Sequence, residues 1–498
     1  MNIFNLLTLG ATRYRNECAI YHGTDEFCTW AELHNRSLRL AAYLADAVPP
    51  GGRVAVIAKN CPEYIEIMFA TWAAGCVVVP VNAKLHGREI SEIITDAEAG
   101  LIFVTAAEAQ NLGQQNLDIP VITIGSPEYN EMFAGEPTVP AEVTPDDLAW
   151  LFFTSGTTGR SKGAMLSHRN LMAMTIAHLA DFEPLRPNDG IIHSAPMSHG
   201  SGLYILPYVA RAACQVVPTS GGFEPEEVLD LCAHHGNIGM FLAPTMVQRL
   251  RLTIEKTGRR PEGLRNIVYG GGPMYLEEIR KSLGVFGPVF CQLYGQGEAP
   301  MTITGLRPAD FADGDDAVLA SVGWPRSGVE VAIFDKEKNT LPPGEIGEIV
   351  CRGDVVMSGY WNNETATETT LSGGWLHTGD LGSMDEDGKL TLRGRSKEVI
   401  ISGGTNIYPR EVEEVLLTCP GVREACVIGE VDPDWGENVV AFIAWEENAT
   451  PDEKLLEAHC LEHMARFKRP KRYIFLEDFP KSPNGKVVKR ELANLLVK

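Results

Sequence analysis

The chain has 498 residues and a formal net charge of −22, and 44% of its residues are hydrophobic. A globular chain of this length is too long for one ordinary core, so we expect at least two domains. The acidic balance argues against nucleic acid as a partner, because binding to a phosphate backbone is driven by clustered cations. Any anionic substrate must therefore be held by local cations.

The cysteines and the apolar segments indicate a cellular compartment. The eleven cysteines are scattered and form no C-x-x-C pair, which is typical of reduced thiols. No segment combines the basic start and cleavage site of a secretory signal, and no apolar run approaches the roughly 20 residues of a spanning helix. We expect a cytoplasmic protein without a membrane span, either a monomer or a homodimer.

Short apolar runs alternate with amphipathic segments through about the first 390 residues. The runs RVAVIA (Arg53–Ala58), VVVPVN (Val77–Asn82) and LIFVT (Leu101–Thr105) predict strands. The segments between them, PEYIEIMFATWAAG and REISEIITDAEAG, predict helices. This alternation predicts parallel βαβ units with buried strands, and so an α/β fold.

A loop rich in glycine and hydroxyl groups, TSGTTGRSKG (Thr154–Gly163), follows the apolar strand LAWLFF. Glycine permits positive φ and close backbone approach, while Ser and Thr add donors and Lys162 adds a cation, so the loop can hold a phosphate. It is not a Walker loop, because Gly159 is not followed directly by Lys and Ser or Thr. We expect it to join the strand directly to a helix capped by Ser167; the alternative is an ordinary flexible turn.

The pattern changes in the last third of the chain. After Gly344 the segments EIGEIVCRG and KLTLRGR predict a β-rich subdomain. Beyond Arg395, two predicted helices (PREVEEVLLTC and DEKLLEAHCLEHM) and three predicted strands (EVIIS, EACVIGEV and VVAFIAWEE) form an α+β module of domain size. We therefore predict a large N-terminal domain over residues 1–394, a hinge over 395–397, and a small mobile C-terminal domain over 398–498.

Five motifs in order resemble the adenylate-forming enzymes, a superfamily of acyl-CoA synthetases, aryl-CoA ligases, luciferases and peptide-synthetase adenylation domains. The motifs are TSGTTGRSKG, YGQGEA (Tyr294–Ala299), HTGD (His377–Asp380), GRSKEVIISGGTNIYP (Gly394–Pro409) and PNGK (Pro483–Lys486). The resemblance covers essentially the whole chain. It implies an ATP-dependent carboxylic acid–CoA ligase that uses ATP, Mg²⁺ and coenzyme A and passes through an acyl-AMP.

The resemblance also implies roles for individual residues. Lys486 would be the catalytic cation that bridges the carboxylate and the α-phosphate, and Glu298 would hold Mg²⁺. Asp380 would accept from the ribose hydroxyls, and Arg395 would reach the ribose or the phosphate. The ATP- and AMP-binding residues would be Thr154, Ser155, Gly156, Thr157, Thr158, Gly159, Lys162, Gly270, Gly271, Gly272, Pro273, Tyr294, Gly295, Gln296, Asp380 and Arg395.

One position departs from the family pattern. The residue before Glu298 is usually Thr, but here it is Gly297, so a hydroxyl expected near the α-phosphate is missing. Water, Thr302 or Thr304 are the possible replacements, and the sequence leaves this choice open.

The second half-reaction would use a different face of the C-terminal domain. The resemblance implies a hinge at Lys397, about which the domain turns to bring Gly403 and Gly404 to the path of the CoA thiol. As in aryl-CoA ligases such as the chlorobenzoate enzymes, Trp435 and Phe467 would stack on the CoA adenine. Arg469 and Lys471 would meet its phosphates; the alternative for this cluster is a solvated basic strand.

The acid pocket predicted by position contains no permanently charged side chain. It consists of His199, Gly200, Ser201, Tyr204, Gly270, Gly295, Met301 and Thr302, with His199 also a candidate catalytic residue or simply a structural histidine. Such a pocket suits a flat aromatic acid or a short to medium-chain monocarboxylic acid, and it disfavours dicarboxylates and amino acids.

Three other functions stay open from the sequence. The enzyme could load a carrier protein in trans instead of CoA, or it could be a luciferase-like oxygenase. A non-catalytic binding protein is the third alternative, and the presence of Lys486, Glu298 and Asp380 argues against it.

Overall fold

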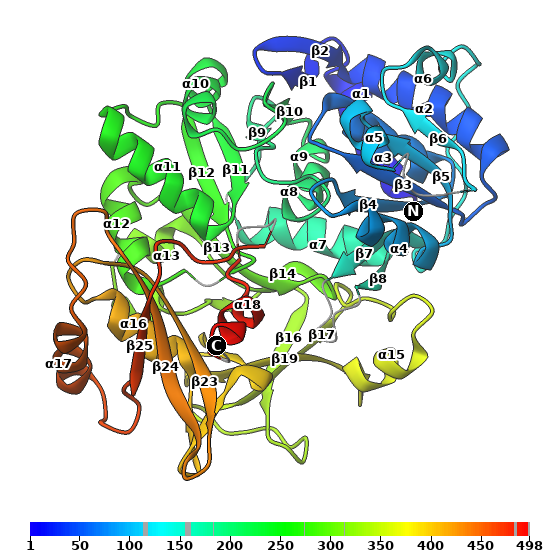
Figure 1. The fold of residues 1–498 in the computed structure, drawn as a ribbon. Coiled ribbons are helices and arrows are strands. Elements are labelled where there is room, and N and C mark those ends of the chain that lie inside the picture. Colours follow the sequence, from blue (N-terminus) through cyan, green and yellow to red (C-terminus); the bar gives the residue numbers. More distant parts are fainter. Residues whose placement is uncertain are drawn as a thin grey trace.

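The computed structural model describes residues 1–112, 118–154, 161–182, 184–272, 274–312, 314–482 and 486–496. Figure 1 shows a large domain, coloured blue to yellow, and a smaller orange and red domain packed below it. Within the described residues the strands form four sheets. The mixed α/β architecture with a small α+β C-terminal part agrees with the predicted fold class.

The first α/β sheet carries the predicted βαβ units. Its order is β6-β5-β3-β4-β7-β8, and β3 lies parallel to both β4 and β5. Its strands are β3 (Arg53–Ala58), β4 (Val77–Asn82), β5 (Ala99–Val104), β6 (Val121–Thr123), β7 (Leu148–Thr154) and β8 (Lys162–Ser167). Buried Val and Ile side chains line both faces of β3 and β4, as the continuous apolar runs predict.

The second sheet of the large domain has nine strands in the order β15-β14-β13-β12-β11-β9-β10-β1-β2. These strands are β1 (Cys18–His22), β2 (Asp25–Thr29), β9 (Gly190–Ile192), β10 (Cys214–Val217), β11 (Ile238–Leu242), β12 (Leu264–Tyr269), β13 (Phe290–Gln296), β14 (Ala299–Leu306) and β15 (Trp324–Pro325).

Helices cover the faces of these two sheets (Figure 1). They are η1 (Ile3–Leu7), α1 (Thr8–Arg13), α2 (Trp30–Ala47), α3 (Pro62–Ala73), α4 (Gly87–Asp96), α5 (Ala106–Leu112), α6 (Pro127–Glu131), α7 (His168–Asp181), α8 (Gly200–Leu203), α9 (Ile205–Val209), α10 (Pro225–His235), α11 (Pro244–Thr257), α12 (Leu276–Phe286), α13 (Pro308–Ala312) and α14 (Asp316–Leu319). In the described part of the chain no helix combines the length and apolarity needed to cross a membrane.

Two further sheets, each of five strands, follow along the chain. The first contains β16 (Val329–Phe334), β17 (Gly347–Gly353), β18 (Leu371–Ser372), β19 (Trp375–Met384) and β20 (Leu390–Arg395), with α15 (Glu364–Thr370) beside it. The second contains β21 (Ile400–Ser402), β22 (Thr405–Ile407), β23 (Val422–Asp432), β24 (Gly436–Trp445) and β25 (Arg472–Phe475). The remaining helices are η2 (Ser396–Glu398), α16 (Pro409–Leu417), α17 (Glu453–His463) and α18 (Lys489–Asn494). The predicted hinge therefore lies in the connection between these two sheets.

One local prediction is wrong. The loop after β7 does not lead directly into a helix, because β8 returns antiparallel to β7 before α7 begins. The pairing of Thr154 with Lys162 places the two ends of the loop side by side at the edge of the sheet. Ser167 caps α7 as predicted, and its hydroxyl accepts from the Asn170 amide at 3.2 Å. The alternating apolar side chains of β8 were too few to stand out in the sequence.

The C-terminal domain contacts the large domain through the start of α12. The Tyr275 hydroxyl donates to Glu413 Oε2 at 2.9 Å, and the Leu276 amide donates to Glu414 Oε2 at 3.1 Å. Arg410 donates to the Met274 carbonyl at 3.3 Å. Because Tyr275 gives α12 no side-chain cap of its own, Glu414 of α16 supplies that cap from the other domain.

Candidate active site

A buried carboxylate lies where β13, β19 and β20 meet. Asp380, on β19, is 4% exposed and receives hydrogen bonds on Oδ2 from the Tyr294 hydroxyl and the Gln296 amide, both at 2.7 Å. Its other oxygen pairs with Arg395 Nε at 2.7 Å, and the two residues are register partners across β19 and β20. One hydrogen-bonded cluster thus contains four residues that were predicted separately, namely Tyr294, Gln296, Asp380 and Arg395.

The protonation of Asp380 follows from this cluster. Burial raises the pKa of Asp380, while Arg395 and the hydrogen bonds from Tyr294 and Gln296 oppose that rise. A carboxylate has about four acceptor positions, and three are already in use. Among the described residues one acceptor position of Asp380 therefore has no donor.

Glycines keep the neighbouring backbone segments in close contact. A Cβ on Gly270 would lie 2.7 Å from the Leu293 side chain, and one on Gly295 would lie 2.7 Å from the Met301 amide. Gly271 has a φ of +76°, which favours glycine. Gly272 is half-buried, and Pro273 lies outside the described residues.

The structure describes only the two ends of the predicted phosphate loop. Ser155, Gly156, Thr157, Thr158 and Gly159 lie outside the described residues. At the ends, Thr154 closes β7 and Lys162 opens β8, and the Lys162 ammonium lies 5.0 Å from the centroid of the Tyr360 ring.

Glu298 lies in the turn between β13 and β14, next to this cation. The Tyr360 hydroxyl donates to Glu298 Oε1 at 2.5 Å. Among the described residues Oε2 accepts no hydrogen bond, so a carboxylate oxygen is available in a half-buried position. A hard carboxylate donor near the Lys162 end of the predicted phosphate loop fits Mg²⁺, which is usually held by one or two carboxylates plus phosphate oxygens.

The space beside Gly297 is filled by other side chains. A Cβ at this position would lie 2.4 Å from Thr154 Cγ2 and 2.8 Å from Phe152 Cδ1. The hydroxyls of Thr302 and Thr304 donate to the carbonyls of Pro300 and Val322, so both are engaged away from this space. Neither threonine replaces the hydroxyl that the family pattern places at position 297.

We expect that the substitution Gly297→Thr, which restores the family residue, lowers both the stability and the activity of the protein. Overpacking of this kind costs about 1–3 kcal/mol, and pressure on the Phe152 ring reaches His199, whose ring centroid lies 5.6 Å away. Chemical denaturation should show a lower free energy of unfolding, and pyrophosphate release should slow. Gly284→Ala is the matched control, since a Cβ there meets nothing within 4 Å; a Gly297→Thr variant more active than wild type would contradict the steric explanation.

Lys486 lies near both ends of the site. Its ammonium acts on the pKa of His199 and on that of Asp380, and it is affected in turn by Arg395 and Asp380. The residue keeps solvent-exposed surface, yet the pKa of Lys486 is lowered, first by partial desolvation of the ammonium among protein atoms and then by Arg395. The charge of Lys486 therefore acts on both the Asp380 cluster and His199 of the predicted acid pocket.

His199 directly precedes α8, as its N-cap residue, and its ring contacts Phe152. Its ring packs edge-on against Phe152 at 76°, and Nδ1 lies 3.0 Å from the Ser198 hydroxyl. Burial, with a smaller contribution from Lys486, lowers the pKa of His199 to about 4. The imidazole is therefore neutral at physiological pH and cannot serve as a fixed cation for an acid.

The other predicted pocket residues differ in what they contact. Tyr204 stacks on Phe241 with ring centroids 5.5 Å apart, and a Cβ on Gly200 would lie 2.4 Å from the same Phe241 ring. Met301 has a φ of +56°, a strained conformation for a non-glycine residue. Ser201 is fully buried, and its hydroxyl lies 2.8 Å from His193 Nδ1.

The candidate CoA residues lie on the C-terminal domain. The Gly403 amide donates to the Trp435 carbonyl at 2.8 Å, and Gly404 follows with a φ of +78°. Trp435 is 54% exposed, and Lys471 Nζ lies 4.5 Å from its ring centroid. The turn between β23 and β24 consists of residues 433–435. In Figure 1 this turn is at the bottom of the molecule, away from the large domain.

The remaining cations of that cluster already have partners. Arg469 Nη1 lies 3.1 Å from Glu457, and Lys468 pairs with Glu411. Phe467 is 51% exposed. Both cations are half-buried, so an anionic ligand would have to displace their carboxylate partners to pair with them.

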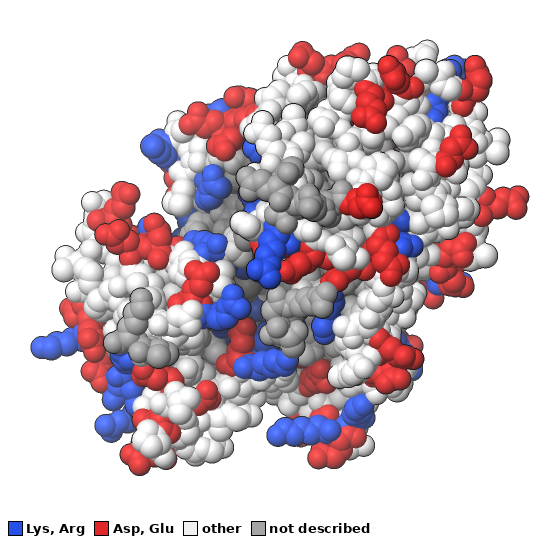
Figure 2. Space-filling view, turned by 45° about the vertical axis from the view of Figure 1, so that its right-hand side comes forward, with Lys and Arg blue, Asp and Glu red and all other residues white. Residues whose placement is uncertain are grey.

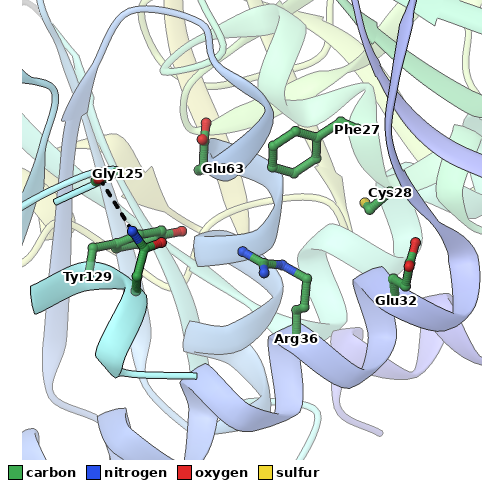
Figure 3. Close-up of a pocket in the computed structure, with 8 residues that line it drawn as sticks. Phe27, Cys28, Glu32, Arg36, Glu63, Gly125 and Tyr129 are labelled. Carbon is green, nitrogen blue, oxygen red and sulfur yellow. Dashed lines mark hydrogen bonds between the residues drawn. The ribbon is translucent and has the colours of Figure 1, made fainter. Parts of the chain in front are cut away.

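A separate cavity of about 300 Å³ lies between β2, α2, α3 and α6 (Figure 3). Its one arginine, Arg36, already donates to the fully buried Glu66, which also accepts from the Tyr129 hydroxyl at 2.7 Å. With Glu32 and Glu63 also lining it, this cavity is poorly suited to a polyphosphate.

The surface charge is locally uneven despite the net negative balance. Figure 2 shows Lys and Arg side chains gathered around the hollow in the middle of that face, whereas Asp and Glu dominate much of the remaining surface. Local cations thus face the hollow, as the sequence requires for an anionic substrate.

Comparison with known proteins gives matches along most of the chain. Residues 8–361 match the family model described as AMP-binding enzyme, and residues 411–486 match the model described as AMP-binding enzyme C-terminal domain. A fatty acid–[acyl-carrier-protein] ligase, ScoC of Streptomyces coeruleorubidus, is 34% identical over 93% of this chain and 91% of its own. A feruloyl-CoA synthase of Amycolatopsis is 33% identical over 95% of both chains. The crystal structure of ATP-bound MatB from Rhodopseudomonas palustris superposes with a TM-score of 0.89 at 32% identity, over 99% of this chain and 98% of that one.

Proposed function

The chain belongs to the AMP-binding enzyme family, and from this premise we propose that it joins one carboxylic acid to CoA through an acyl-adenylate. At the level of reaction class it is an AMP-forming acid–CoA ligase that uses ATP. The observation that carries the finer proposal is that the charge of Lys486 influences the pKa of both His199 and Asp380, so the ammonium lies within electrostatic range of both. In this arrangement one cation faces both the predicted acid and the predicted nucleotide.

The first half-reaction exchanges a poor leaving group for a good one. The acid's carboxylate oxygen attacks the α-phosphorus of ATP, the bond to pyrophosphate breaks, and the carboxyl group becomes a mixed anhydride with AMP. Negative charge is spread over the phosphate oxygens during this step, so positioning and positive charge are the main requirements. Lys486 supplies that charge, and its lowered pKa reflects the partly desolvated place it occupies.

The remaining residues bind and orient. Asp380 would accept from the ribose and Arg395 would hold the carboxylate in place, while Gly270, Gly271 and Tyr294 would border the adenine. Glu298 would hold Mg²⁺, which supplies charge neutralisation at the phosphates when bound. The neutral His199 would form a wall of the acid pocket beside Phe152.

The second half-reaction would require the C-terminal domain to turn about Lys397. Three of the hydrogen bonds that hold the present arrangement join Tyr275 to Glu413, Leu276 to Glu414, and Arg410 to Met274. Turning would move Lys486 away and bring Gly403 and Gly404 to the adenylate. The CoA sulfur then attacks the acyl carbon, AMP leaves, and the thiol proton passes to solvent or to the departing phosphate.

Trp435→Ala tests the CoA-binding face. Because the Trp435 ring is exposed and held by Gly403 and Lys471, its loss should remove stacking worth about 1–3 kcal/mol with little effect on folding. We expect the KM for CoA to rise about tenfold and the KM for ATP to stay nearly constant in steady-state assays. Phe475→Ala, which removes another partly exposed aromatic side chain of the same domain, is the control; equal changes in both KM values would contradict this assignment.

The substrate we propose is an aromatic acid of the benzoate or hydroxycinnamate type, or a short to medium-chain monocarboxylic acid. Aromatic rings of Phe152, Tyr204 and Phe241 and the neutral His199 support this, since they offer flat apolar contacts and no fixed charge. A pyrophosphate-release screen over benzoates, cinnamates and C4–C12 acids, with and without CoA, tests it. Dicarboxylates and amino acids are screened beside them, and turnover restricted to these two groups would reject the substrate class.

A carrier protein is the second candidate acceptor. It is favoured by the similarity to a fatty acid–[acyl-carrier-protein] ligase. The two acceptors are separated by supplying the acid and ATP with either CoA or a phosphopantetheinylated carrier protein and measuring the thioester formed. Product with the carrier alone would replace CoA in the proposal.

A further inference from the structure

One tyrosine outside all five motifs joins the metal and phosphate ends of the site. Tyr360 lies between β17 and α15 and is 7% exposed. Its hydroxyl donates to Glu298 Oε1 at 2.5 Å, and its ring faces Lys162 with 5.0 Å between the ammonium and the ring centroid. The same side chain therefore contacts both charged groups that would face MgATP.

The backbone around Tyr360 is fixed by the phosphate strand. The Trp361 amide donates to the Gly163 carbonyl at 2.8 Å, and the Met165 amide donates to the Gly359 carbonyl at 2.9 Å. The Tyr360 amide donates to the Thr367 hydroxyl at 2.8 Å. These hydrogen bonds fix the backbone of Tyr360 to β8, the strand that begins at Lys162.

The Glu298 side of the contact is equally anchored. The Met357 amide donates to the Glu298 carbonyl at 2.8 Å, so the segment that carries Tyr360 also holds the Glu298 backbone. Gly297 offers no side chain, and within the described residues Tyr360 is the side-chain donor to the Glu298 carboxylate.

We propose that Tyr360 is a positioning residue that holds the Glu298 carboxylate for Mg²⁺ and the Lys162 ammonium for phosphate in one arrangement. Its hydroxyl occupies Oε1 and leaves Oε2 for the metal, and its ring stabilises the cation through its negative face. The inference rests on the proposed function in that ATP is the ligand.

The two contacts are separable by substitution. Tyr360→Phe keeps the ring and removes the hydrogen bond, whereas Tyr360→Leu removes both. Tyr129→Phe is the matched control, because it deletes another tyrosine–glutamate hydrogen bond, that of Tyr129 with Glu66, in the cavity of Figure 3. Calorimetric titration of each full-length variant with ATP, in Mg²⁺ and in EDTA, measures the gain in affinity that the metal provides.

For Tyr360→Phe we expect that gain to fall about tenfold or more, as is typical when a residue that orients a metal ligand is lost. Its affinity for ATP in EDTA should stay at the wild-type value, and its thermal unfolding midpoint should change little. Tyr360→Leu should also lose several-fold in EDTA. Tyr129→Phe should unfold at a lower temperature and keep the full metal-dependent gain.

An unchanged metal-dependent gain in Tyr360→Phe would overturn the proposal, as would an equal loss of affinity with and without the metal. If the wild-type protein bound ATP under neither condition, the proposed ligase function itself would fail. The failure of the two proposals is thereby distinguishable.

Discussion

Replacing Lys486 with alanine should abolish acyl-adenylate formation, with a loss of about 10²–10³ in rate. Lys486 is the cation that lies near His199 on one side and Asp380 and Arg395 on the other. Its removal takes positive charge away from the place where the attacking carboxylate and the α-phosphate would meet. The measurement is pyrophosphate release with the best acid found in the screen.

The control for this variant is built from the same segment. Lys481→Ala removes a neighbouring lysine that pairs with Glu424 at 2.7 Å, and it should adenylate at nearly the wild-type rate. Lys486→Ala should also still form the thioester from supplied acyl-AMP and CoA, since that step is proposed to occur with Lys486 turned away. A variant that adenylates normally would show that this lysine is not the catalytic cation.

Asp380→Asn is expected to raise the KM for ATP about a hundredfold. The amide brings two N–H donors into a cluster where Tyr294, Gln296 and Arg395 already donate. Hydrogen bonds to a charged group are worth about 1.5–3 kcal/mol each, and every 1.4 kcal/mol is a factor of ten in affinity. Steady-state kinetics with varied ATP measure the effect.

Tyr294→Phe provides the graded comparison for Asp380→Asn. It removes one of three donors and leaves the carboxylate ionised and paired with Arg395, so its effect on the KM for ATP should be clearly smaller. Circular dichroism on both variants checks that the fold persists. If the Asn variant bound ATP as tightly as wild type, the assignment of Asp380 to the nucleotide would be wrong.

The sequence predicted the strand–helix alternation, because apolar runs and glycine-rich turns are local signals. It predicted β3 and β4 with their bounds, and it placed the cap of α7 at Ser167. It missed β8, whose six residues form a strand only because β7 lies beside them. A local sequence pattern does not predict which strand such a segment will pair with.

The contacts within the site were less accessible to sequence reasoning. Asp380 and Tyr294 are 86 positions apart, and their hydrogen bond depends on how two different sheets meet. Tyr360 lies in none of the quoted motifs, although the aromatic pair at Tyr360 and Trp361 next to a glycine was a visible signal. Ser201 was grouped with the acid pocket by position, whereas the structure directs its hydroxyl to His193.

The helix α12 has a consequence for observing the enzyme at work. The first amides of a helix have no partner within it, and the Leu276 amide is satisfied by Glu414 of the C-terminal domain. If that domain turns about Lys397, the amide is released to water, and the exchange of its proton for deuterium should accelerate. The exchange rate of the Leu276 amide thus reports the position of the domain, without an attached probe and without turnover.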